Sequence, residues 1–187
     1  SVSSSSSSSE PSSGFAVGDA SNPDFGFEAD SFDSAPADFD NEGSIVVSNE
    51  VAREGTQVVK LNHTTEGQVR MRREFVATES GSVKGSLYFS TDTDQDTLIT
   101  LYAAEYNSDN RAIDIIFKGD GSIRRREGSE QEDVMRYDLG GWIDIEIQWD
   151  NLATSNEFTL IINGDSVGTF AAATAGLTPE RVEVKYG

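Results

Sequence analysis

Arginine and apolar side chains alternate in residues 67–76, which read GQVRMRREFV. Val69 and Met71 are each followed by an arginine, Arg70 and Arg72. Because successive side chains of a strand point to opposite faces, this segment predicts a strand with one buried and one charged face. A row of guanidinium groups on such a face either forms the floor of a binding surface or is an ordinary solvated surface. The segment alone allows both interpretations.

Arg73 directly follows Arg72 and so breaks the alternation. This indicates either a β-bulge, which shifts the following residues to the other face, or a buried arginine paired with a carboxylate.

Other segments add arginine and aromatic side chains to the polar side of their strands. Aromatic rings pack on the apolar CH faces of sugars, and the planar guanidinium fork binds hydroxyls, carboxylates or sulfates through paired hydrogen bonds. We therefore predict one shared binding face formed by Arg70, Arg72, Tyr88, Tyr102, Arg124, Arg126 and Trp142. The alternative is that these residues are divided between two sheets and form ion pairs with Glu74, Asp114 and Glu127.

The elements that would position these residues are short strands rich in Val, Ile, Phe, Tyr and Thr, which recur about every ten residues. The predicted strands are 44–47, 57–62, 68–76, 83–90, 97–105, 111–118, 122–127, 134–137, 142–149, 158–163, 166–171 and 181–186. Glycine-containing turns separate several of them, for example 118–122 and 163–165, and these predict tight hairpins. The fold class is therefore all-β, a two-sheet antiparallel β-sandwich.

Composition limits the partners of this 187-residue chain. The net charge is −19, and residues 1–50 contain no Lys or Arg, which argues against nucleic acid, since its binding depends on basic surfaces. No apolar run approaches the length of a membrane span, so membrane insertion is not expected. The chain has no cysteine, which leaves no disulfide or thiolate metal site. High acidity also suits a protein that recruits divalent cations.

Two domains are predicted: a disordered poly-serine linker at 1–13 and a β-sandwich at 14–187. The tract SVSSSSSSSEPSS cannot bury apolar surface. It resembles linkers between the modules of secreted polysaccharide-degrading enzymes of marine bacteria, and it also resembles the tether of bacterial lipoproteins. Either resemblance implies an extracellular or cell-surface location and a larger assembly.

The order of several motifs carries a resemblance to a known family. These motifs are GTQVVKL at 55–61, GSLYF at 85–89, GWIDIEIQWD at 141–150 and FTLIINGD at 158–165. Over residues 25–187 they resemble concanavalin A-like jelly rolls, in particular the laminin-G-like carbohydrate-binding modules attached to polysaccharide lyases and glycoside hydrolases. The resemblance implies a carbohydrate-binding module for residues 14–187, with polysaccharide as the partner and a covalently linked catalytic module. It also implies a structural Ca²⁺ near the first and last strands, for which Glu28 and Asp30 are the candidate ligands.

Catalysis by this chain is not expected. Arg70 and Arg72 are similar to the arginine-rich strand of alginate lyase jelly rolls, but the Gln-x-His and tyrosine-rich motifs of those enzymes are missing, and the single histidine, His63, precedes the strand. Asp144 and Glu146 match the paired acids of jelly-roll glycosidases poorly. The predicted function is non-catalytic binding of an extracellular polysaccharide, for instance an acidic marine glycan such as alginate. A jelly-roll polysaccharide lyase and a structural or adhesion domain are the alternatives.

Overall fold

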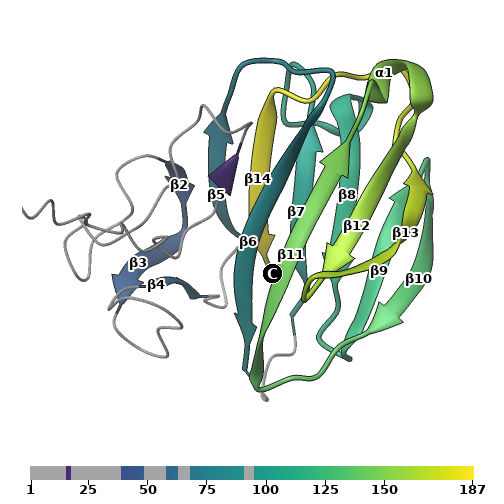
Figure 1. Ribbon diagram of the computed structural model, residues 1–187. Helices are drawn as coiled ribbons and strands as arrows, with labels where there is room; N and C mark the ends of the chain where they lie inside the picture. Colours follow the sequence, from purple (N-terminus) through teal and green to yellow (C-terminus); the bar gives the residue numbers. More distant parts are fainter. Residues whose placement is uncertain (1–15, 18–38, 49–57, 63–67, 91–94) are drawn as a thin grey trace, which may run out of the picture.

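The computed structural model describes residues 16–17, 39–48, 58–62, 68–90 and 95–187. Two antiparallel sheets pack face to face (Figure 1). In spatial order, the five-stranded sheet comprises β1 (Ala16–Val17), β6 (Gly81–Phe89), β11 (Gly141–Trp149), β12 (Glu157–Ile162) and β13 (Asp165–Ala171). The seven-stranded sheet comprises β10 (Glu130–Arg136), β9 (Ser122–Glu127), β8 (Arg111–Phe117), β7 (Thr97–Tyr102), β14 (Arg181–Tyr186), β5 (Val69–Glu74) and β2 (Asp40–Glu42).

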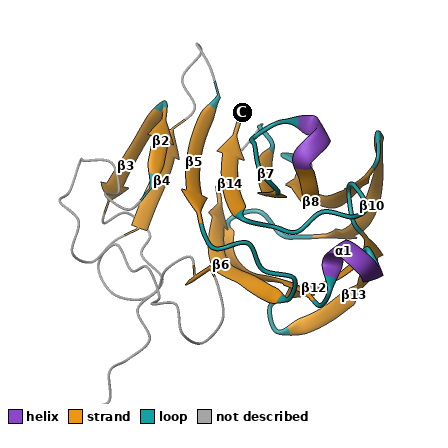
Figure 2. Ribbon diagram, turned by 90° about the horizontal axis from the view of Figure 1, so that it is seen from above, coloured by secondary structure: helices purple, strands orange, loops and turns teal. Residues whose placement is uncertain are grey.

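Three smaller elements complete the described structure. A separate ladder pairs β3 (Ser44–Ser48) with β4 (Val58–Asn62). A single 3-10 turn, η1 (Ser108–Asn110), precedes β8, and a one-turn helix, α1 (Leu152–Ser155), joins β11 to β12. Figure 2, seen from above, shows the two layers edge-on, with β6, β12 and β13 in one and β5, β14, β7, β8 and β10 in the other.

The sandwich prediction is confirmed, and each of the twelve predicted strands corresponds to an observed one. Sequence reasoning missed β1 and β2, and it began β10 four residues too late. The first part of β10, Glu130–Asp133, is exposed at the sheet edge. An edge strand that is exposed to solvent on both faces needs no alternation of apolar and polar residues. The sequence pattern therefore does not identify this part of β10 as a strand.

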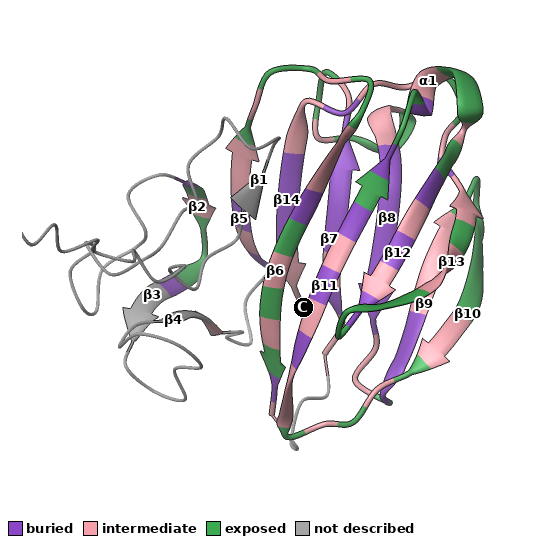
Figure 3. Cartoon of the chain, in the orientation of Figure 1, coloured by how far each residue is buried: buried purple, intermediate pink, exposed green. Residues whose placement is uncertain are grey.

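The hydrophobic core lies between the sheets, and strand alternation produces it. Val69 and Met71 of β5 point inward together with Val182 and Val184 of β14, and isoleucines of β11 meet them from the other sheet. Bands of buried and less buried residues therefore alternate along β6, β11 and β12 (Figure 3).

Both predicted hairpin turns are present. Lys118 N donates to Ser122 O at 2.8 Å, and the intervening Gly121 adopts a φ of 81°, which a side chain would strain. The Asp120 carboxylate accepts from Ser122 N and Oγ, and these hydrogen bonds lower the pKa of Asp120. Asn163 and Gly164 form the second turn, both at positive φ, the conformation of a two-residue type I′ turn.

Several predictions fall outside the described residues and remain predictions. They include the linker at 1–13, the Ca²⁺ ligands Glu28 and Asp30, and His63. In the described part of the chain, no helix has the length and apolar character needed to span a membrane.

Candidate functional site

The outer face of the seven-stranded sheet carries an unusual number of cations. Eight of the 14 Lys and Arg residues of the chain lie there. We call this surface the cationic face, and its cations are Arg70, Arg72, Arg111, Arg124, Arg126, Arg136, Arg181 and Lys185.

Strand register places the polar groups of this face in rows that cross the sheet. Arg72 of β5 is opposite Glu183 of β14, Glu183 is opposite Thr100 of β7, and Thr100 is opposite Asp114 of β8. Arg126 of β9 continues the row through an ion pair with Asp114 at 2.7 Å. In the neighbouring row, Arg70 lies opposite Lys185. These rows run perpendicular to the strands.

Glu183 is the first of two buried carboxylates beneath the cations, with 4% of its surface exposed. Its Oε2 accepts from Arg72 Nε at 2.7 Å and lies 4.0 Å from Arg70 Nε, while its Oε1 accepts from the Tyr102 hydroxyl at 3.2 Å. Burial lowers the pKa of Arg72, but the hydrogen bond and charge of Glu183 outweigh burial and raise it. Glu183 therefore fixes the orientation of the Arg72 side chain and favours its charged form.

Asp114 is the second buried carboxylate, with only 1% of its surface exposed. Its Oδ1 accepts from Thr100 Oγ1 at 2.7 Å, and its Oδ2 accepts from Arg126 Nε at 2.7 Å and lies 3.5 Å from Arg111 Nε. A carboxylate this deeply buried is stable only with such charged and hydrogen-bonding partners. Asp114 therefore anchors Arg126 and Arg111 as Glu183 anchors Arg72.

Lys185 differs from these arginines because its ammonium group forms no direct ion pair within the described residues. Within the described residues, no carboxylate lies within 4.0 Å of its ammonium group and no hydrogen bond to it is found. Partial burial lowers the pKa of Lys185, and the positive charges of Arg70 and Arg111 lower it further, against the opposing effects of Glu183 and Asp114. The ammonium group of Lys185 is thus partly desolvated, and an anion in direct contact with it would favour its charged form.

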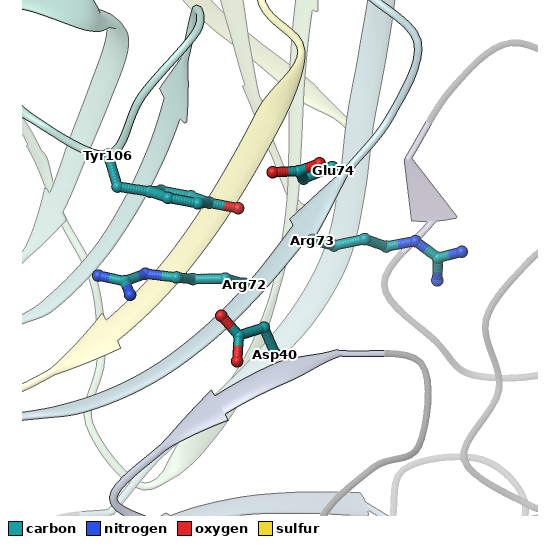
Figure 4. A pocket seen from close by; sticks show the side chains of 5 residues that line it. All are labelled: Asp40, Arg72, Arg73, Glu74 and Tyr106. Atoms are coloured by element: carbon teal, nitrogen blue, oxygen red, sulfur yellow. The ribbon is translucent and has the colours of Figure 1, made fainter.

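Tyr106, on the loop between β7 and η1, covers one end of the cationic face. The Arg72 guanidinium carbon lies 4.6 Å from its ring centroid, and that of Arg181 lies 5.5 Å from it. A pocket of about 290 Å³ opens here, lined by Asp40, Arg72, Arg73, Glu74 and Tyr106. Figure 4 shows the Tyr106 ring above Arg72 with Asp40 below, whereas Arg73 points away from them.

The two tyrosines beside Arg72 are poor proton acceptors. Burial, followed by the negative charge of Glu183, raises the pKa of Tyr102 to about 12. Burial and the charge of Glu74 raise that of Tyr106 to about 12 as well. Both phenols are therefore neutral at ordinary pH.

The structure brings five of the seven predicted binding residues to one face and separates the other two. Arg70, Arg72, Tyr102, Arg124 and Arg126 belong to the seven-stranded sheet. Tyr102 is 6% exposed and packs edge-on against Tyr106, so its ring is covered and only its hydroxyl takes part, through Glu183.

The prediction of a single shared face is wrong for Tyr88 and Trp142. They lie on β6 and β11 of the five-stranded sheet, which is the other side of the sandwich. Alternation shows which side chains of a strand point away from the core, but it does not show to which of two sheets the strand belongs.

The predicted alternative, ion pairing of the arginines, also holds in part. Asp114 pairs with Arg126 as expected, whereas Glu74 pairs with Arg181 at 3.1 Å and Glu127 with Arg125 at 2.8 Å. For Arg73, the β5–β14 register continues without a shift, so no bulge is present. The Arg73 guanidinium carbon lies 5.6 Å from the Phe39 ring centroid.

Four residues of this candidate site were not predicted: Arg111, Tyr106, Glu183 and Lys185. The alternation of β14, in which Val182 and Val184 face the core, was the signal that could have placed Glu183 and Lys185 on the outer face. Tyr106 is in a loop, where no periodicity exists to locate it. In the part of the chain that the structure describes, no group of three or more His, Asp or Glu side chains is arranged to hold a metal ion.

Comparison with known proteins identifies the fold. No protein-family model and no characterised protein sequence matches the chain. An endo-beta-1,4-glucuronan lyase from the fungus Trichoderma reesei is 13% identical, with a TM-score of 0.54 over 86% of this chain and 80% of that one. The carbohydrate recognition domain of Emp46p is 11% identical, with a TM-score of 0.51 over 76% and 80%.

A sialidase is also similar, at 16% identity and a TM-score of 0.37, over 64% of this chain. This chain spans only 12% of the sialidase. At these identities the likeness shows the fold alone, a jelly-roll sandwich of the concanavalin A-like kind.

Proposed function

We propose that this protein binds an acidic polysaccharide, without cleaving it, on the cationic face. One observation carries the proposal: Lys185 is partly buried beside Arg70 and forms no direct ion pair within the described residues, in a chain with 33 acidic and 14 basic residues. A cluster of cations is costly in such a chain unless it serves an anion. Carboxylates or sulfates of a glycan would supply that anion.

The arrangement of the arginines supports the same ligand. Arg72 and Arg126 use Nε to bond Glu183 and Asp114, which fixes their orientation, and Arg72 Nη1 also lies 3.6 Å from Glu42 Oε2. The Arg126 side chain is 18% exposed, and Asp114 is the one carboxylate with which it forms an ion pair within the described residues. A guanidinium that is already oriented loses little conformational freedom when it grips a carboxylate through two hydrogen bonds.

The rows of cations suggest how the glycan lies. Arg70 and Lys185 are on adjacent strands, and Arg124 and Arg126 are on β9, three strands from β14. Because neighbouring strands are about 4.8 Å apart, a polymer that crosses the strands would meet cations repeatedly along its length. A uronic acid polymer such as alginate, with a charge on every residue, fits this spacing.

The wider setting is part of the proposal. An extracellular or cell-surface protein that is tethered by the serine-rich segment to a catalytic module would hold that module at its substrate. The tether would raise the effective concentration of the catalytic module at the polysaccharide, so a weak affinity of this domain for the glycan suffices. The fold is compatible with this role, since the glucuronan lyase and the Emp46p carbohydrate recognition domain share it.

A structural Ca²⁺ held by Glu28 and Asp30 belongs to the same proposal, and those residues lie outside the described part of the chain.

Binding is tested by affinity electrophoresis and by titration calorimetry with alginate, against a neutral glucan on the same gels. Lys185→Gln and Arg126→Gln should each weaken alginate binding about tenfold, since each removes a charged hydrogen-bonding group. Lys84→Gln is the matched control, because Lys84 makes an ion pair with Glu146 on the other sheet and the substitution changes the net charge equally. If alginate and other acidic glycans leave the wild-type protein unretarded, or if all three variants lose affinity equally, the proposal is wrong.

A polysaccharide lyase is the second candidate, because Arg72 lies beside two tyrosines. A lyase needs a base that removes a proton next to the uronate carboxylate. Raised pKa values near 12 make Tyr102 and Tyr106 unsuited to that task, and the described part of this face has no histidine. Incubation with alginate should therefore produce no rise in ultraviolet absorbance from unsaturated products. Such a rise would replace binding with cleavage as the function.

A further inference from the structure

Tyr88 and Trp142 form a pair of aromatic rings on the outer face of the five-stranded sheet. They are opposite each other in the β6–β11 register, with ring centroids 5.6 Å apart and planes inclined by 59°. Tyr88 is 39% exposed, and Trp142 is partly exposed. Burial of an exposed aromatic ring against a ligand is favourable, because it removes apolar surface from water. Two adjacent exposed rings are therefore a candidate contact surface.

The pair lies at an open end of the sheet. The β11–β12 pairing begins at Ile145, so β11 carries Trp142 beyond the turn of the β12–β13 hairpin. Asn163 of that turn bonds the backbone N of Asp144 at 2.9 Å. In Figure 1 the viewer faces the outer side of this sheet, with β6, β11 and β12 in front. A polymer can therefore lie across the rings and pass the hairpin tip.

The polar side chains beside these rings bond one another across the β6–β11 pair. Ser86 donates to Asp144 at 2.6 Å in the next row of the sheet, and Lys84 pairs with Glu146 at 2.9 Å in the row after that. The rows beside the rings therefore contain one cation, Lys84, and two carboxylates, and they offer no excess positive charge. Aromatic rings beside paired polar groups suit a neutral pyranose, whose CH face packs on the rings while its hydroxyls meet the polar row.

We propose that Tyr88 and Trp142 are a second glycan-binding site, with neutral β-linked pyranose chains as ligands. Because the two sheets pack face to face, this site and the cationic face point to opposite sides of the sandwich. One molecule then binds an acidic chain on one side and a neutral chain on the other, and it links two kinds of polysaccharide. The second site does not depend on the cationic face, and either can be present without the other.

Tryptophan fluorescence isolates this site, because the chain has only two tryptophans. Trp149 is 4% exposed in the core, so a ligand on the surface reports through Trp142. Titration of the full chain with cellohexaose should shift the emission to shorter wavelength and reduce quenching by acrylamide. Tyr88→Ala should weaken cellohexaose binding about tenfold, as expected for the loss of one stacked ring. Tyr88→Leu, which keeps an apolar side chain but no ring, should behave similarly, and circular dichroism checks that both variants fold.

Two controls separate this site from the cationic face. Lys185→Gln should leave cellohexaose binding unchanged, and Tyr88→Ala should leave alginate binding unchanged. If cellohexaose changes neither the emission nor the quenching of the wild-type protein, the second site is wrong, whatever alginate does. The same conclusion follows if Tyr88→Ala and Tyr88→Leu fold and bind cellohexaose as the wild type does. Loss of alginate binding in folded Tyr88→Ala would show that the two faces are not separate sites.

Discussion

At the level of single residues, two buried carboxylates organise the cationic face. Glu183 and Asp114 are each held by at least one arginine and one hydroxyl group. Neither carboxylate is accessible enough to contact a ligand directly. Their role is to orient guanidinium groups, so they are positioning residues rather than binding residues.

Lys185 predicts a pH dependence of alginate binding. Burial and the neighbouring arginines hold its folded-state pKa below the ordinary 10.5, so it loses its proton at a lower pH than a free lysine. A bound anion favours the charged form, so affinity should fall as the pH rises toward about 10. Tyr102 and Tyr106 stay neutral in this range because their pKa values are about 12. Calorimetry across this pH range measures the effect.

The Lys185→Gln variant is the control for this pH dependence. Its weaker affinity should stay nearly constant across the same range, because the titrating ammonium group is gone. An equal fall in affinity in wild type and variant would assign the pH dependence to another group. With respect to stability, a depressed lysine pKa means that the unfolded chain binds the proton more tightly, so the unfavourable contribution of Lys185 to folding decreases as the pH rises.

At the level of elements, Arg125 joins the two sheets. It is opposite Ile115 in the β8–β9 register and so lies on the core side of β9. Its guanidinium carbon is 5.4 Å from the Phe170 ring centroid on β13, and its nitrogens bond Glu127 at 2.8 Å and Glu132 at 2.6 Å. This cation–π contact connects the edges of both sheets at the end opposite β2.

Arg125→Ala should lower the free energy of unfolding by about 2 kcal/mol, because it removes this contact and leaves two carboxylates close together. Arg124→Ala is the matched control on the same strand, since Arg124 pairs with the exposed Asp133 and should contribute less than about 1 kcal/mol. Urea unfolding with an unchanged m-value measures both. Equal losses in the two variants would show that Arg125 does not join the sheets.

At the level of the whole molecule, the net charge of −19 is opposite in sign to the charge of the local cation cluster. Salt therefore affects folding and ligand binding differently. Self-repulsion of the acidic chain destabilises the compact state, and added salt screens it. Salt also screens the attraction between the cationic face and an acidic glycan. The two effects have opposite consequences for stability and binding.

Raising NaCl from about 0.05 M to about 0.5 M should therefore increase the Tm of the free protein while it weakens alginate binding. Cellohexaose binding should change little over the same range, because stacking on Tyr88 and Trp142 involves no net charge. Thermal unfolding and calorimetry in matched buffers make the comparison. A Tm that falls with salt would mean that specific ion pairs, rather than overall repulsion, dominate the electrostatics of folding.

The local pattern of the sequence was sufficient for twelve strands, for the hairpin turns at Gly121 and Gly164, and for the core-facing side of several strands, among them β5, β6 and β11. Alternation and turn chemistry are local, so twelve strands could be located from the sequence. They also placed Arg70 and Arg72 on an outer face. The exposed edge of β10 and the Tyr106 loop lacked such a pattern and were not predicted.

Only the tertiary structure decided which strands share a sheet. Strand pairing between β5 and β14, more than a hundred residues apart in sequence, brings Arg72 to Glu183, and no local signal specifies it. The same pairing sets Lys185 beside Arg70, while the β6–β11 pairing puts Tyr88 and Trp142 on the opposite side of the sandwich. A side chain's face follows from the two-residue period of its own strand, whereas its neighbours follow from long-range register, which packing of the whole core determines.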